Sequence, residues 1–356
     1  MTEKFWSEFK PRDDASSLII ENFFKSLRDG ESIEITEEDR EKYGLLVTGP
    51  ISEDTMKFSV EGSRELNEIQ QKAKDFVGRY IKKFVEDVNK KNEKEGKKQM
   101  EDWPKINIAD VKVMDNGECN IVARTGETSY GRVVAFKGEG LRKAYDDYAK
   151  EYSVSGEEIL PFEEFERLFM PNVPAVSTLI MTADNNILLT KRSPRKVSSY
   201  EEAWHLPAGY LDNKDKNERG EVDPFIAAKR EINEEVGLTK EQIDDLVCLG
   251  IMRNRDGGIN EFLFVARTTM RSDEIVDKNI KVGESRLLLH PKDIDGDVRP
   301  RKLIKSGKIS TVLPALLKID EVFGKDKKGE PGPELTVPSS KALFFLVDKL
   351  LKKMKS

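Results

Sequence analysis

The sequence feature that most restricts the fold of this chain is a short helix whose two ends are both marked. Asp223 is a good N-cap residue, Pro224 suits the first helical position, and Gly237 fits just past the last turn. The helix is therefore about three turns long. Apolar strand-like runs lie on both sides of it, at residues 175–181 and 246–252. This alternation predicts a mixed sheet flanked by helices.

The same helix carries three carboxylates on one face. At about 100° per residue, the apolar side chains fall on the other face. The acidic face consists of Glu231, Glu234 and Glu235. Like charges at this spacing destabilise a helix unless cations or water neutralise them, and a hard divalent cation with oxygen ligands is the obvious partner. Arg230, four residues before Glu234, can orient that carboxylate through charge-assisted hydrogen bonds. For an isolated run of this kind, a solvated acidic surface is the alternative interpretation.

Length and composition indicate a soluble globular protein. The chain has 356 residues, of which 37% are hydrophobic and 35% charged, and this length predicts two domains. The formal charge of −6 disfavours non-specific attraction to long nucleic acid. No apolar run approaches the roughly 20 residues of a membrane span, and residues 1–14 lack a secretion signal. We therefore expect a cytoplasmic protein without a membrane partner.

The few cysteines and histidines exclude several kinds of chemistry. Cys119 and Cys248 lie far apart and lack metal-ligand spacing, so we interpret both as buried hydrophobes. His205 and His290 are the two histidines of the chain, which disfavours mechanisms that need clustered imidazoles. The chemistry must therefore come from carboxylates, lysines and arginines.

The first part of the chain predicts an α+β domain over residues 1–165. Apolar side chains recur at helical spacing over residues 63–92, and residues 106–114 alternate like a strand. A turn at residues 115–117 leads into a second strand at residues 119–124. The role of residues 1–60 is not readable from the pattern.

The second domain is expected to cover residues 166–356. Residues 175–181 and 187–191 predict a hairpin, and residues 339–355 form an amphipathic helix that we expect to pack on the domain. The other predicted elements are a helix at 224–236 and strands at 246–252, 261–267 and 285–290.

The acidic helix resembles the Nudix box, in which a glycine loop, a helix and a second loop hold divalent metals against a diphosphate. The resemblance rests on Gly209, Glu221 and the run from residue 230 to 238, within which every restricted position matches. It implies a Nudix-type α/β/α sandwich, with Arg230 as the orienting residue and three metal ligands, Glu231, Glu234 and Glu235. One departure is the spacing: eleven residues separate Gly209 from Glu221 where the family has five. The extra residues 212–220 can be absorbed in a surface loop.

The resemblance also implies a cofactor and a general base. Mg²⁺ or Mn²⁺ would bridge the phosphate oxygens and lower the pKa of a bound water. Glu284 stands where many family members carry a catalytic glutamate outside the box, and Glu231 is the competing base. Glu261, at the start of an apolar strand, is a further candidate metal ligand.

A weaker resemblance, spread over residues 60–350, points to the branch of this family that hydrolyses UDP-glucose and UDP-galactose in animals. It rests on short runs at 128–130, 250–254, 261–262, 283–285 and 338–342. It implies hydrolysis of a UDP-sugar to UMP and a sugar 1-phosphate, with ADP-ribose or a dinucleotide as the alternative substrate. The candidate substrate-binding residues are Tyr130, Arg192, Gly209, Arg253 and Asn254, with Lys191 as a further candidate for phosphate or sugar oxygens.

Two hypotheses from other classes stay open. The first is a non-catalytic module that binds a nucleotide sugar, although binding alone does not require three metal carboxylates. The second is a nucleic-acid role such as cap removal, which the acidic balance disfavours. Within the enzyme hypothesis, we further expect the amino-terminal domain to help form the substrate site through Tyr130, because loops at domain boundaries commonly line ligand pockets.

Overall fold

A computed structural model gives the fold of this chain. It describes residues 14–96, 99–113, 118–184, 186–188, 190–191, 204–254, 259–271, 274–275, 312–314 and 338–353. The predicted turn at 115–117 and strand at 285–290 lie outside the described residues, and so do Arg192 and Glu284.

A seven-stranded mixed sheet forms the centre of the molecule. Its strand order is β1-β10-β11-β5-β6-β12, and β9 also pairs with β5. The strands are β1 (Leu45–Ile51), β5 (Val173–Met181), β6 (Asn186–Leu188), β9 (Ala208–Tyr210), β10 (Ile243–Asn254), β11 (Ile259–Thr268) and β12 (Val312–Pro314). β11 and β5 run parallel, whereas β5 and β6 form the antiparallel hairpin predicted from the sequence. The predicted mixed sheet is therefore confirmed.

Alternation along the central strands directs side chains to the two faces of this sheet. β5 is buried along its whole length, which explains its continuous apolar run. On β11, Phe262 and Phe264 belong to one core cluster, and Leu263 and Val265 belong to another. The sheet therefore separates two apolar layers.

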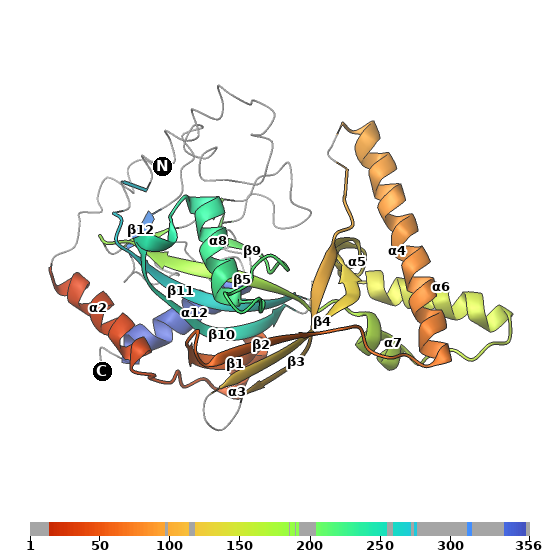
Figure 1. Cartoon of the computed structure of the whole chain (residues 1–356), viewed down its shortest axis with the longest axis horizontal. Coiled ribbons are helices and arrows are strands. Elements are labelled where there is room, and N and C mark those ends of the chain that lie inside the picture. Colours follow the sequence, from red (N-terminus) through yellow and green to blue (C-terminus); the bar gives the residue numbers. More distant parts are fainter. Residues whose placement is uncertain are drawn as a thin grey trace.

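Each face of the main sheet is covered by a different set of elements (Figure 1). The helices α2 (Asp14–Arg28) and α12 (Pro338–Lys353) pack on the face that carries Leu263. The helix α8 (Pro224–Val236) packs on the opposite face, against Phe264. The carboxy-terminal helix thus packs on the domain as predicted. Among the described residues, no helix combines the length and the apolar character needed to cross a membrane.

A second, three-stranded sheet shares the core under α8. Its strands are β2 (Met56–Glu61), β3 (Pro104–Val113) and β4 (Cys119–Ser129), in the order β2-β4-β3. Their buried side chains join those of α8 and the main sheet in one cluster. Cys119 and Cys248 are both free and buried in this cluster, as predicted, and burial raises the pKa of the Cys119 thiol to about 11.

Four helices form a separate cluster beside the three-stranded sheet (Figure 1). The helix predicted over residues 63–92 is α4 (Glu68–Lys94), which begins at a capping box formed by Asn67 and Gln70. Its apolar stripe packs on α5 (Tyr130–Ala135), α6 (Gly140–Val154) and α7 (Phe162–Phe169).

Residues 14–51 pack with the second half of the chain. β1 pairs with β10 in the main sheet, where Leu45 lies opposite Met252, and α3 (Glu37–Tyr43) leads into it. α2 buries Phe23 and Phe24 beneath the same sheet face as α12. Residues 14–51 therefore complete the core of the second half of the chain. The sequence reasoning missed this because residues 1–60 show no pattern that specifies a distant partner.

Candidate active site on α8

Local sequence determines where α8 begins and ends. The Asp223 side chain accepts a hydrogen bond of 2.7 Å from the backbone N–H of Phe225, and Pro224 occupies the first turn. Gly237 ends the helix with φ of 78°, a left-handed conformation that favours glycine. The predicted helix is thus confirmed, with both of its marked ends.

Arg230 is the centre of the polar contacts around α8. Its Nε and Nη2 donate to the two carboxylate oxygens of Asp215 at 2.7 and 2.9 Å. Nη2 also donates to the carbonyl of Tyr210 at 3.0 Å. Nη1 donates to Glu231 Oε1 and lies 3.5 Å from Glu234 Oε2. Burial lowers the pKa of Arg230, but its hydrogen bonds to Asp215 and the charge of Glu231 outweigh that effect and raise the pKa overall. Arg230 therefore stays charged and holds two of the helix carboxylates.

Glu231 lies against the backbone of Gly209. Its side chain is buried, and a Cβ atom at position 209 would overlap the Glu231 carboxyl group. A larger residue at 209 would therefore displace the Glu231 carboxyl group from its position against β9. Burial raises the pKa of Glu231, and the neighbouring Arg230 opposes that shift.

The other two acids of the helix differ in exposure. The Glu234 side chain is 47% exposed, whereas Glu235 is half-buried and its Oε2 accepts a 3.3 Å hydrogen bond from the backbone N–H of Ala208. Across the described ranges, no three Asp, Glu, His or Cys side chains are arranged so that they could hold a metal ion. The three carboxylates share a helix face but do not form a finished metal cage, because Glu231 faces Arg230 and Glu235 faces the β9 backbone.

Asp215 holds the position that sequence analysis gave to Glu221. Asp215 is 1% exposed and binds Arg230 through both oxygens. Glu221 is exposed, and its carboxylate contacts Asn217 and Arg219 instead. Five residues separate Gly209 from Asp215, which is the family spacing, so the insertion follows the acid instead of preceding it. The family spacing counted from Gly209, with aspartate accepted in place of glutamate, would have identified Asp215 from the sequence.

Glu261 lies on the other face of the main sheet from α8. It is 6% exposed, and its Oε2 accepts a 2.9 Å hydrogen bond from Ser177, whose hydroxyl is 3.0 Å from that of Ser339 on α12. By strand alternation it shares a face with Leu263 and not with Phe262, which packs in the α8 cluster. The structure does not place Glu261 on the acidic face of α8.

Tyr130 contacts the strand β9 of the main sheet through Tyr210. The two rings are 6.3 Å apart between centroids and meet edge to face at 76°. Tyr210 directly follows Gly209 on β9, and Tyr130 opens α5 after the amino-terminal strand β4. Lys105, on β3, places its ammonium 5.1 Å from the centroid of the Tyr210 ring. Sequence reasoning missed Lys105, because one lysine in a strand carries no signal of its own.

Arg253 and Asn254 lie at the end of β10, away from β9. The register places Met252 beside Glu261, Glu261 beside Ala175, and Ala175 beside Tyr210. Three strand spacings therefore separate the row of Arg253 from β9, or about 14 Å. The Arg253 side chain is exposed.

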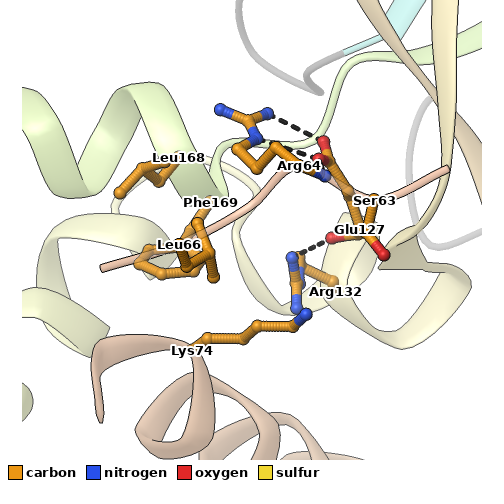
Figure 2. A pocket seen from close by; sticks show the side chains of 8 residues that line it. All are labelled: Ser63, Arg64, Leu66, Lys74, Glu127, Arg132, Leu168 and Phe169. Carbon is orange, nitrogen blue, oxygen red and sulfur yellow. Dashed lines mark hydrogen bonds and ion pairs between the residues drawn. The ribbon is translucent and has the colours of Figure 1, made fainter. Parts of the chain in front are cut away.

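A hollow elsewhere in the described residues is lined by three cationic side chains, Arg64, Lys74 and Arg132, and one carboxylate, Glu127 (Figure 2). Arg64 donates to both oxygens of Glu127 at 2.8 and 2.7 Å, and its backbone N–H adds a third bond. Arg132 donates to the Glu127 carbonyl. The hollow lies between the amino-terminal sheet and helices, so it is distinct from the α8 acids.

Comparisons with known proteins give one matching family model and several curated relatives. A family model of the NUDIX domain matches residues 171–330. An RNA pyrophosphohydrolase of Rickettsia bellii is 38% identical over 78 residues, which are 22% of this chain and 42% of the relative. The enzyme of the same name from Rickettsia typhi is 40% identical over 76 residues, or 21% of this chain and 40% of the relative. The chain thus spans about two fifths of the curated relatives it matches.

Solved structures give weaker likenesses. A bifunctional NMN adenylyltransferase/ADP ribose pyrophosphatase from Francisella tularensis is 23% identical with a TM-score of 0.22, covering 36% of this chain and 33% of that chain. A structure described as an ADP compounds hydrolase is 13% identical with a TM-score of 0.31, covering 72% of this chain and 98% of that one. The assignment rests instead on the family match, in which α8 and its surroundings lie. Residues 171–330 therefore resemble the NUDIX domain.

Proposed function

We propose that this protein is a Nudix-type diphosphatase, which uses water to split a nucleoside diphosphate linked to another group into a nucleoside monophosphate and a phosphorylated product. The observation that carries the proposal is the arrangement on α8. Glu231, Glu234 and Glu235 share one helix face, and Arg230 and the Gly209 backbone hold Glu231 there. A structural helix does not need three acids at one place, since their repulsion destabilises it.

The metal we propose is Mg²⁺ or Mn²⁺, held by Glu231, Glu234 and Glu235. Carboxylate oxygens are the ligands that these hard cations prefer, and the half-exposed Glu234 can receive one from solvent. Bound metal would neutralise the diphosphate and lower the pKa of a water molecule.

For the general base we propose Glu284, with Glu231 as the competitor. Glu231 is buried and bonded to Arg230, so a role in metal binding or orientation uses its geometry better than proton acceptance does. Glu284→Gln should lower the maximal rate, leave metal affinity almost intact, and change the acidic limb of the pH–rate profile. An equal loss of metal binding would place Glu284 among the ligands instead.

For the substrate we propose a UDP-sugar such as UDP-glucose, with ADP-ribose or a dinucleotide as the alternative. Tyr130 and Tyr210 meet beside Gly209, where an aromatic base could stack while the helix acids hold the diphosphate. The relatives named RNA pyrophosphohydrolase add RNA with phosphorylated ends as a substrate to be tested.

One screen tests the proposal. The full chain is incubated with Mg²⁺ and UDP-glucose, ADP-ribose, a diadenosine compound or end-phosphorylated RNA, and the products are separated by chromatography. We expect UDP-glucose to give UMP and glucose 1-phosphate. Turnover of ADP-ribose alone would keep the diphosphatase class and replace the substrate. Tight binding of these compounds with no product from any of them would favour a non-catalytic binding module.

A further inference from the structure

Lys105 brings a positive charge from the amino-terminal sheet to the edge of the proposed active site. It lies on β3 opposite Thr128, two residues before Tyr130. Its ammonium sits over the ring of Tyr210, whose own carbonyl accepts a hydrogen bond from Arg230. The contact thus crosses from the three-stranded sheet to β9.

The environment of this ammonium is unusual for a lysine. It is partly buried, and in the described part of the chain no hydrogen bond or ion pair is found for it apart from the contact with the Tyr210 ring. Burial lowers the pKa of Lys105, while the charges of Asp212 and Glu231 partly offset that effect and Arg230 adds to it. A partly buried ammonium without a bonded anion is destabilising, so we expect an anion to bind beside Lys105.

We propose that Lys105 binds a non-bridging phosphate oxygen of the substrate, so that the diphosphate is held between the amino-terminal sheet and α8. This inference rests on the proposed function for the identity of the ligand. An ammonium is a compact point charge that suits a phosphate oxygen, and a tyrosine ring beneath it supports the cation without neutralising it. The helix acids repel a diphosphate that has no bound cation. Lys105 on β3 would add a positive charge to that of the metal.

The three-stranded sheet and β9 of the main sheet meet at Tyr210. Lys105 approaches Tyr210 with a charge from β3, and Tyr130 approaches it with a ring from the start of α5, directly after the neighbouring strand β4. A nucleotide placed there would contact an aromatic surface and a cation at once. The amino-terminal strands would then contribute directly to substrate binding.

Calorimetric binding of an α,β-methylene nucleoside diphosphate tests the proposal in the presence of Mg²⁺, because this analogue cannot be hydrolysed at the linkage. We compare the full-length wild-type chain with Lys105→Met, which keeps length and removes charge, and Lys105→Arg, which keeps charge. Lys112→Met is the matched control, because Lys112 lies on the same strand, is exposed, and pairs with Asp110 at 2.9 Å.

We expect Lys105→Met to bind the analogue roughly tenfold more weakly, the loss of one charge-assisted contact. Lys105→Arg should recover part of the affinity, and Lys112→Met should behave like the wild type. Thermal unfolding of Lys105→Met should be unchanged or occur at a higher temperature, because a buried charge has been removed.

The outcomes separate this inference from the proposed function. Equal binding of the analogue by Lys105→Met and the wild type overturns the role of Lys105, even if the wild type hydrolyses diphosphates. If the wild type hydrolyses nothing yet Lys105→Met binds more weakly, the site binds diphosphates through Lys105 and the enzymatic proposal fails. Absence of analogue binding by the wild type overturns both.

Discussion

Two buried arginine–carboxylate pairs, one in each half of the molecule, have nearly the same geometry and different surroundings. Arg230 binds Asp215 through two bonds of 2.7 and 2.9 Å, and Arg64 binds Glu127 through two of 2.8 and 2.7 Å. Bidentate pairs of this kind fix both side chains in one orientation. Geometry of the pair alone therefore does not distinguish a functional site from a structural one.

The difference lies in the charges left beside each pair. Next to Arg230 stand two more carboxylates, Glu231 and Glu234, of which the second is half-exposed. Next to Glu127 stand the Asn107 amide, at 3.4 Å, and Arg132. Excess negative charge facing solvent can attract metal ions, whereas the surroundings of the Arg64–Glu127 pair carry excess positive charge and would repel them. We expect substitutions at the first pair to affect chemistry and those at the second to affect stability.

The largest expected effect is on turnover at the α8 acids. Glu234→Gln or Glu235→Gln should lower kcat by about a hundredfold or more, because these groups are proposed to hold the metal that stabilises developing charge. Stability without metal should be unchanged or slightly higher, since like charges are removed. Glu221→Gln, in the exposed loop, is the control and should retain normal activity. Near-normal magnesium-dependent rates in either α8 variant would refute the ligand assignment.

A matched pair of substitutions separates the two arginine sites. Asp215→Asn and Glu127→Gln each remove one charge from a bidentate pair, and each should lower the free energy of unfolding by about 2 kcal/mol. Only Asp215→Asn should also reduce kcat, because it releases Arg230 from its orientation beside Glu231. Urea unfolding and steady-state kinetics of the same preparations measure both quantities. Equal kinetic effects of the two variants would contradict the comparison.

A smaller effect is expected at acid pH, where the Arg64–Glu127 pair should lose its contribution to the free energy of unfolding. Burial raises the pKa of Glu127, but the hydrogen bonds from Arg64 outweigh it and hold that pKa at about 2, against an ordinary value of 4.5. A depressed carboxyl pKa gives stability that is present above the ordinary value and is lost as pH falls toward the depressed one. The stability difference between wild type and Glu127→Gln should therefore shrink between pH 4.5 and about 2. A difference that stays constant over this range would argue against the charged pair.

The smallest expected effect concerns the aromatic contact across the two halves. Tyr130→Ala should raise the apparent KM for nucleotide sugars several-fold, equivalent to about 1 kcal/mol of lost stacking, with little change in kcat. Tyr130→Phe keeps the ring and should keep the affinity. If Tyr130→Ala leaves KM and the ranking of substrates unchanged, Tyr130 only packs against Tyr210.

The sequence predicted those parts of the fold that depend on local chemistry. α8 was found because Asp223, Pro224 and Gly237 mark its ends within fifteen residues. The hairpin of β5 and β6 and the helix α12 followed in the same way from apolar patterning. β1 could not be found, because its strand identity depends on pairing with β10 some 200 residues later, which no local pattern encodes.

The sequence also predicted part of the candidate site. The helical spacing of the acids placed Glu231, Glu234 and Glu235 on one face, as α8 does. Asp215 was missed because the insertion could be placed on either side of it, and only the bidentate contact with Arg230 decides between them. Lys105 and Tyr210 meet through packing of two sheets, and the sequence does not specify how these sheets dock.

β1 lies at the edge of the main sheet, and α2 and α12 pack side by side beneath it. This arrangement affects when the core can form during synthesis. Arg28, at the end of α2, pairs with Asp245, which lies 217 residues away, and α12 adds the last layer of that core. During synthesis Phe23 and Phe24 must wait uncovered until residues 338–353, which complete their core cluster, have also left the ribosome. A chain truncated to begin near residue 162 would lack this layer and expose the edge of β10. Measurements on this fragment would report its aggregation more than its substrate preference.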